Sequence, residues 1–156
     1  MLKAPTHEHF MKLALAEAEK AFEADEVPVG AVITCKNQVI ARAHNYSERL
    51  NDFTAHAEMQ AYTAATEYLG GKYLDICTLY VTLEPCMMCA GGAFNTRIGT
   101  IVFGASDQKR GFTSFQGALT DGRTIVHPKT QIIRGIMEEE CSQILSAFFE
   151  RKRKLE

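Results

Sequence analysis

The chain has 156 residues and 17.3 kDa, with 17 basic and 19 acidic side chains and therefore a formal charge of −2. This balance excludes a protein that attracts nucleic acid through a globally basic surface. The hydrophobic share of 46% is ordinary for a globular protein, and no apolar run reaches the roughly 20 residues that span a bilayer. The first residues show no signal-peptide pattern, so we expect one cytoplasmic domain over residues 1–156.

The first half of the chain predicts one helix, a hairpin and a second helix. Thr6 can cap a helix that runs to about residue 25 with its apolar residues on one face. Residues 29–34 and 38–43 are strand-like runs joined by a three-residue turn, which is typical of a hairpin. A polar loop over residues 45–54 follows. Residues 56–69 are rich in helix formers, and the two glycines after them predict the helix end.

The second half predicts a strand, helix, strand unit followed by a long loop and a last helix. Residues 78–83 and 100–104 are apolar on both alternations, as in strands covered on both faces, and residues 86–95 form a short helix between them. Such a crossover is parallel and right-handed. A loop spans residues 105–135 with a possible short strand at 132–133, and a helix closes the chain over 137–154. The order predicts a three-layer α/β/α fold with a mixed five-stranded sheet.

Cysteine usage argues against a disulfide framework, because five is an odd number and two of the five form a C-x-x-C spacing. Cys35, Cys77 and Cys141 lie among apolar residues, so we expect buried thiols there.

Three potential zinc ligands and one further carboxylate stand out. His56 and Glu58 belong to a His-Ala-Glu run, and Cys86 and Cys89 to a Pro-Cys-Met-Met-Cys run, both at predicted helix starts. Two cysteines three apart lie on one side of a helical turn, where the helix dipole favours thiolate. Structural zinc sites usually have four protein ligands, whereas catalytic sites have three and leave the fourth position to water. We therefore expect His56, Cys86 and Cys89 to bind Zn²⁺ and Glu58 to move protons.

This donor set predicts hydrolysis of an amine from a ring carbon. Zinc lowers the pKa of bound water from about 15.7 to about 7, and a carboxylate in hydrogen-bond reach can take that proton. Hydroxide would attack an sp² carbon, and Glu58 would protonate the ring nitrogen and then the departing amine. The C-x-x-C alone could be a redox pair and the His-x-Glu alone a solvated turn, but neither alternative accounts for both.

Together the two motifs resemble the cytidine deaminase-like superfamily, whose H-x-E…P-C-x-x-C signature the chain carries. Within it the chain is most similar to the bacterial tRNA-specific adenosine deaminases. The similarity covers about residues 7–154 and includes segments 27–32, 54–58, 79–91, 97–99, 102–105 and 139–141.

The resemblance implies a zinc enzyme that converts the wobble adenosine of an arginine tRNA anticodon to inosine. It implies that His56, Cys86 and Cys89 hold zinc and that Glu58 shuttles protons. It also implies a homodimer whose two subunits both contact the anticodon loop. Three further residues match the family's base-binding positions, as a side-chain amide, a pocket wall and a backbone donor: Asn45, Val29 and Ala57.

Candidate RNA contacts lie outside these motifs. Phe53 replaces a proline that is usual in the family, and an exposed aromatic side chain could stack on a base. The segment 106–119 also departs from the commonest family form and carries a basic pair. The C-terminal helix resembles that of the RNA-editing branch. The expected contacts there are Lys109, Arg110, Phe148, Arg151 and Lys152.

Two other functions remain open from the sequence. A small-molecule deaminase of the guanine or cytosine type has the same zinc site and fits the negative charge better. A non-catalytic nucleic-acid or scaffold module that keeps zinc for stability is the third possibility, and the intact Glu58 argues against it.

Overall fold

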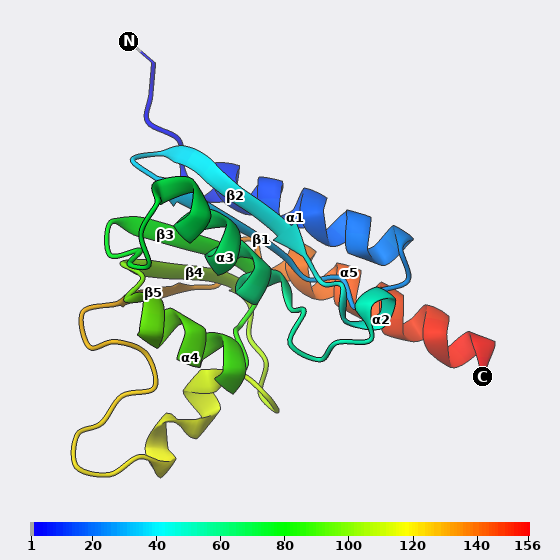
Figure 1. Ribbon diagram of the computed structural model, residues 1–156. Coiled ribbons are helices and arrows are strands. Elements are labelled where there is room, and N and C mark those ends of the chain that lie inside the picture. Colours follow the sequence, from blue (N-terminus) through cyan, green and yellow to red (C-terminus); the bar gives the residue numbers. More distant parts are fainter. Residues whose placement is uncertain (1) are drawn as a thin grey trace.

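The computed structural model describes residues 2–156, and its helices lie on both faces of a mixed sheet (Figure 1). The three-layer fold expected from the sequence is confirmed. The elements in chain order are α1 (His7–Glu23), β1 (Gly30–Cys35), β2 (Gln38–His44), α2 (Ser47–Leu50), α3 (Ala57–Leu69), β3 (Cys77–Leu83), α4 (Met87–Thr96), β4 (Thr100–Ala105), the 3-10 helix η1 (Phe112–Ala118), β5 (Gln131–Arg134) and α5 (Glu138–Leu155).

The sheet has the strand order β2-β1-β3-β4-β5. β1 is antiparallel to both β2 and β3, whereas β3, β4 and β5 are parallel to one another. β2 and β3 are therefore not neighbours. They point the same way because both oppose β1. Their ends consequently lie at the same edge of the sheet.

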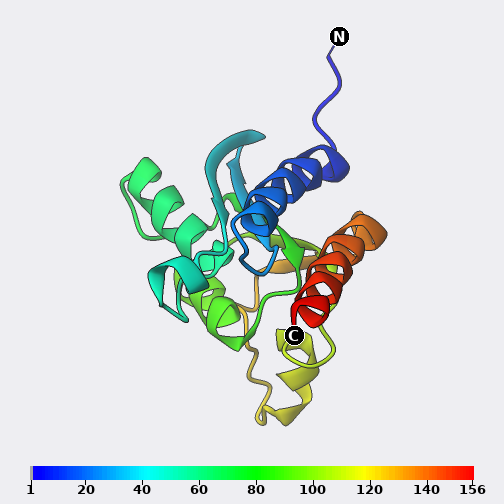
Figure 2. The same cartoon turned by 90° about the vertical axis from the view of Figure 1, so that its right-hand side faces the viewer.

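The two faces of the sheet have separate cores. Figures 1 and 2 show α1 and α5 on one face and α3 and α4 on the other. Val32, Tyr80 and Val102 point toward α1 and α5, where they pack with Phe10 and Cys141. The alternate residues of the same strands point toward α3 and α4; they include Ala31, Ile33, Leu79, Val81, Ile101 and Phe103. The continuous apolar runs in the sequence are thus explained by burial on both sides.

The helix ends follow the sequence signals. Thr6 caps α1, because its hydroxyl oxygen accepts a hydrogen bond from the His9 amide at 3.1 Å. Gly70 ends α3 in the left-handed conformation at φ 68°. The expected loop over residues 45–54 contains the short helix α2, and the long loop after β4 contains η1, so both are more ordered than the sequence indicated.

The remaining expectations concern cysteines and membrane segments. Cys77 and Cys141 are buried as expected, but Cys35 is only half-buried near the end of the hairpin strand β1. Among residues 2–156, no helix combines the length and apolar character that crossing a membrane requires.

Candidate active site

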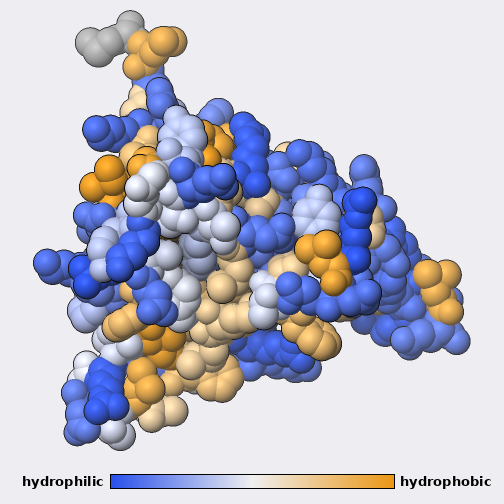
Figure 3. Space-filling view, viewed as in Figure 1, coloured by the Kyte–Doolittle hydropathy of each residue, from blue (hydrophilic) through white to orange (hydrophobic). Residues whose placement is uncertain are grey.

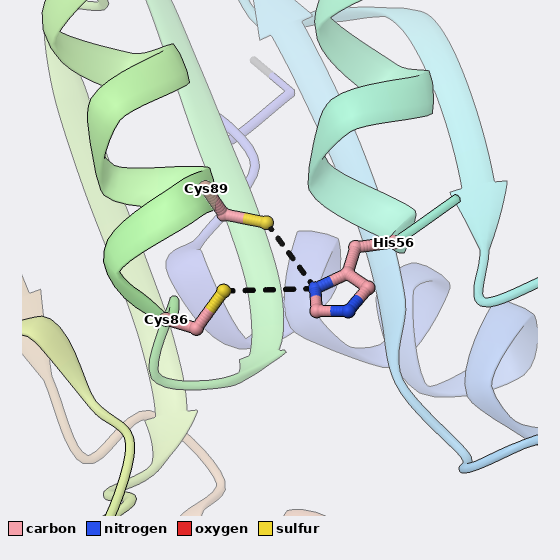
Figure 4. A group of neighbouring side chains, drawn as sticks. All are labelled: His56, Cys86 and Cys89. Carbon is pink, nitrogen blue, oxygen red and sulfur yellow. Dashed lines mark hydrogen bonds between the residues drawn. The ribbon is translucent and has the colours of Figure 1, made fainter. Parts of the chain in front are cut away.

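The candidate metal ligands come from the N-terminal ends of α3 and α4. His56 immediately precedes α3, Cys86 immediately precedes α4, and Cys89 lies in the first turn of α4. Neither His56 nor Cys86 uses its side chain to cap its helix, so both side chains are available to a ligand. The three side chains point toward one another across the gap between the helices (Figure 4).

The spacing of these side chains fits a tetrahedral zinc ion. His56 Nδ1 lies 3.6 Å from Cys86 Sγ and 3.5 Å from Cys89 Sγ, and the ligand atoms of all three lie within 4.8 Å of one another. Tetrahedral zinc with Zn–S of about 2.3 Å and Zn–N of about 2.0 Å separates nitrogen from sulfur by about 3.6 Å. His56, Cys86 and Cys89 can therefore hold one metal ion.

The two thiols have opposite proton affinities. The hydrogen bond from Cys89 is the main reason that the pKa of Cys86 falls to about 4, and the hydrogen bond with His56 contributes although burial opposes it. The same Cys86–Cys89 hydrogen bond raises the pKa of Cys89, together with burial and the negative charge of Glu58. A bound divalent cation would stabilise both thiolates, because a coordinating thiol is deprotonated.

Electrostatic effects also reach the histidine ligand. The pKa of His56 is raised, chiefly by its hydrogen bond with Cys86, while burial opposes this shift. The negative charge of Glu58 raises the same pKa, and the positive charge of Arg110 lowers it. Arg110, which follows β4, is thus close enough to act on a residue that begins α3.

Glu58 lies beside the metal ligands in the first turn of α3. Glu58 is only 4% exposed. Burial is the largest cause that raises the pKa of Glu58, and the charge on His56 opposes this rise. A carboxyl group with a raised pKa takes up a proton more readily than a solvated one, which suits a general acid and base.

Two buried residues that were not predicted from the sequence connect segments around the candidate site through hydrogen bonds. Tyr62 is 4% exposed and its hydroxyl donates to the Cys89 carbonyl oxygen at 2.9 Å. Glu26 is fully buried, and its two carboxylate oxygens accept from the amides of Glu48 and Arg49 at 2.8 and 2.9 Å. Glu26 thereby fixes the N-terminus of α2. A glutamate directly before the Val-Pro-Val-Gly segment was its only sequence signal.

The three expected base-binding residues lie near the start of β1 and the start of α3. The Asn45 amide donates to the Val29 carbonyl oxygen at 3.1 Å. The Asn45 side chain is 7% exposed, and its oxygen accepts from the Ser47 amide at 3.1 Å and also from the Ser47 hydroxyl. Ala57 is the first residue of α3 and is fully buried. Asn45 therefore caps its own loop, whatever further role it has.

The expected RNA contacts near the active site are exposed. The Phe53 side chain is 91% exposed in the loop between α2 and α3. Lys109 and Arg110 are also exposed, in the turn after β4, where the Asp107 side chain accepts hydrogen bonds from both of their amides at 3.1 and 3.0 Å.

The expected contacts on α5 are differently placed. Phe148 is only 3% exposed and packs on the ring of Phe22 with centroids 6.0 Å apart, so it joins α5 to α1 and offers no surface to RNA. This corrects the expectation for Phe148. Arg151 donates to the Phe22 carbonyl oxygen and to Asp25, and Lys152 also pairs with Asp25 at 2.6 Å. The side chains of Arg151 and Lys152 therefore already have hydrogen-bond and ion-pair partners within the chain.

Comparisons with known proteins identify the family of the chain. The MafB19-like deaminase family model matches residues 5–153. The tRNA-specific adenosine deaminase of Bacillus subtilis (strain 168) is 45% identical over 147 residues, which is 94% of this chain and 91% of that protein. A solved structure from a study of A-to-I editing by tRNA:A34 deaminases is 44% identical, with a TM-score of 0.81 over 88% of this chain and 99% of that chain.

A guanine deaminase structure from Bacillus subtilis is more distant. It is 30% identical, with a TM-score of 0.65 over 79% of this chain and 83% of that chain. The family match, the relatives and the His, Cys, Cys and Glu arrangement all lead to one assignment. The chain belongs to the deaminase family whose members include the bacterial tRNA-specific adenosine deaminases.

Proposed function

We propose that the protein hydrolyses the wobble adenosine of a tRNA anticodon to inosine. The observation that carries this proposal is the 45% identity to a tRNA-specific adenosine deaminase over 94% of the chain. The site supports it, because His56, Cys86 and Cys89 have the spacing of a metal site and Glu58 lies beside them with a raised pKa. The overall reaction consumes water and releases ammonia.

Glu58 carries the proton transfers in this proposal. Zinc held by His56, Cys86 and Cys89 would supply a water molecule with a pKa of about 7 as the nucleophile. The Glu58 carboxylate takes the proton from this water and delivers it to the adenine ring nitrogen next to the reacting carbon. A second transfer by Glu58 moves the proton of the newly added hydroxyl group to the departing amine, so that ammonia leaves and the carbonyl of inosine forms. Its burial keeps bulk water from competing for these protons.

The substrate contacts are also part of the proposal. Asn45 can contact a purine edge through one side-chain N–H, because its other N–H donates to the Val27 carbonyl oxygen and its oxygen accepts from the Ser47 amide and hydroxyl. Val29 forms a pocket wall and the Ala57 amide is a backbone donor. The exposed Phe53 stacks on a base of the anticodon loop, which is worth about 1 to 3 kcal/mol per base. Lys109 and Arg110 bind phosphates.

We also propose a homodimer in which two copies meet near α4. Apolar surface gathers over α4 and the adjoining η1 segment in Figure 3, where Met87, Phe94 and Phe115 are about 40% exposed. Met87 lies directly between the two cysteine ligands in sequence, so a partner here would border the active site. Light scattering should give twice 17.3 kDa. Phe94→Glu should lower the measured mass to that of the monomer, whereas Leu155→Glu at the far end of α5 should leave the mass unchanged.

The direct test is deamination of a synthetic anticodon stem-loop with adenosine at the wobble position. Zinc-loaded protein should produce inosine, detected by nuclease digestion and mass spectrometry. A stem-loop that stays unmodified at low and at physiological salt would overturn the proposed substrate. A tRNA substrate would also place the enzyme in the cytoplasm.

A free-base deaminase is the second candidate, because the guanine deaminase structure shares the fold at 30% identity. Ammonia release from guanine or cytosine without any RNA would support this candidate. Turnover of the stem-loop alone would exclude it.

A further inference from the structure

Glu84 is a buried carboxylate between the end of β3 and Pro85, and it has no role in the proposed chemistry. Its side chain is 3% exposed. One oxygen accepts from the Asp107 amide at 3.3 Å. The other accepts from the Thr113 amide at 3.0 Å and from the Thr113 hydroxyl at 2.8 Å. A single carboxylate therefore bonds both ends of the 107–113 segment, which we call the β4 loop.

The β4 loop also runs along the segment that carries a metal ligand. Gly111 forms an isolated antiparallel bridge with Cys86, and the Phe112 amide donates to the Pro85 carbonyl oxygen at 2.9 Å. Phe112 is buried and its ring lies 6.5 Å from that of Phe103. Arg110, which directly precedes Gly111, is exposed, and its positive charge acts on His56.

Gly111 fits Glu84 closely. A Cβ atom at position 111 would overlap the Glu84 carboxylate and the Asp107 carbonyl oxygen. The contact between carboxylate and loop therefore requires glycine at this position. The shape of the loop, and hence the position of Arg110, depends on how Glu84 is bonded.

Stability alone does not explain a carboxylate here. Among residues 2–156 no lysine, arginine or histidine forms a salt bridge with Glu84. Burying an unpaired charge is unfavourable, and a well-packed apolar residue often stabilises such a position as much or more. What a carboxylate adds is four lone-pair directions that fix several loop donors at once.

We propose that Glu84 is a positioning residue that holds the β4 loop so that Arg110 contacts an RNA phosphate beside the target nucleotide. This inference rests on the proposed function. Glu84 acts through Arg110 and does not touch the substrate itself. A residue that only stabilised the fold would have no specific link to the RNA phosphates.

The test compares wild type, Arg110→Gln, Glu84→Gln and the double variant in steady-state deamination of the stem-loop at several salt concentrations. Loss of one phosphate contact lowers the slope of log KM against log salt by about 1. We expect this reduction for Arg110→Gln, the same reduction for Glu84→Gln, and no further reduction for the double variant. KM should rise severalfold while kcat and zinc content stay near wild type.

Graded variants guard against a misfolded Glu84→Gln protein. Thr113→Ser keeps all three bonds to Glu84 and should behave as wild type, whereas Thr113→Val removes one bond and should raise KM by less than Glu84→Gln. If wild type deaminates the stem-loop and Glu84→Gln or Thr113→Val keeps the wild-type salt slope, the inference is wrong. Additive slope changes in the double variant would also overturn it. A wild-type protein without activity on the stem-loop would instead overturn the proposed function.

Discussion

The hydroxyl of Tyr62 donates a hydrogen bond of 2.9 Å to the carbonyl oxygen of Cys89. This bond joins α3 to α4 at Cys89, which is itself a candidate metal ligand. Each helix brings at least one ligand from its N-terminal end, so the distance between the helices determines the distance between the ligands. Tyr62 therefore helps to set the distance between the candidate metal ligands without being one of them.

Tyr62→Phe should lower the free energy of unfolding of the zinc-loaded protein by about 0.5 to 1.5 kcal/mol, the net worth of one hydrogen bond. Urea unfolding followed by circular dichroism measures it. Tyr68→Phe is the matched control, because Tyr68 lies on the same helix and is 66% exposed. Equal effects of the two substitutions would show that the Tyr62 bond contributes nothing specific.

Glu58→Gln should reduce kcat by about 10² to 10⁴, the usual contribution of a general acid or base. The amide cannot shuttle protons, but it leaves the three candidate ligands intact. The bound zinc, measured by elemental analysis, should stay at the wild-type level. Glu67→Gln, an exposed glutamate on the same helix, should keep full activity. Loss of zinc from Glu58→Gln would contradict a role beside the metal rather than on it.

The pKa of Cys86, about 4, predicts how the zinc-stripped protein reacts with iodoacetamide. Only the thiolate reacts, so Cys86 should be alkylated at a nearly constant rate from pH 5 to pH 8 and more slowly only below about pH 4. A free thiol with a pKa of about 8.5 would react about tenfold more slowly for each unit by which the pH is lowered over the same range. Peptide mass spectrometry follows the sites separately. Cys89, whose pKa is raised, should stay unmodified while Cys86 reacts. Faster reaction at Cys89 than at Cys86 would show that Cys89, and not Cys86, is the thiol with the lowered pKa.

Glu26→Gln should destabilise the protein by about 1 to 3 kcal/mol, because one of the two α2 amides loses its charged acceptor. The loop that contains Asn45 and Phe53 should then be cleaved faster by protease, and mass spectrometry would locate the cuts. Glu23→Gln, on the exposed end of α1, serves as control. Cleavage sites that do not change would mean that Glu26 does not order this loop.

The sequence predicted most of the elements, and the three side chains that come together as candidate ligands, because those signals are local. A His-x-Glu run, a C-x-x-C run and two-sided apolar strands can each be recognised in a few residues. The contacts of Glu26 and Glu84 could not be predicted, because a buried carboxylate looks the same in sequence as a solvated one until its loop partners are placed. Phe148 was wrongly expected to face RNA for the same reason. Its burial depends on Phe22, 126 positions earlier in the chain.

The position of β1 between β2 and β3 determines when, during folding, the candidate metal ligands come together. His56 follows β2, and the cysteines follow β3, so the two sets of ligands meet only after both strands have paired with β1. The β1–β3 pairing closes a loop of more than forty residues, a non-local contact of the kind that forms slowly in folding. High-affinity zinc binding should therefore follow the assembly of the sheet. Only protein molecules whose sheet has formed would then bind the ion tightly.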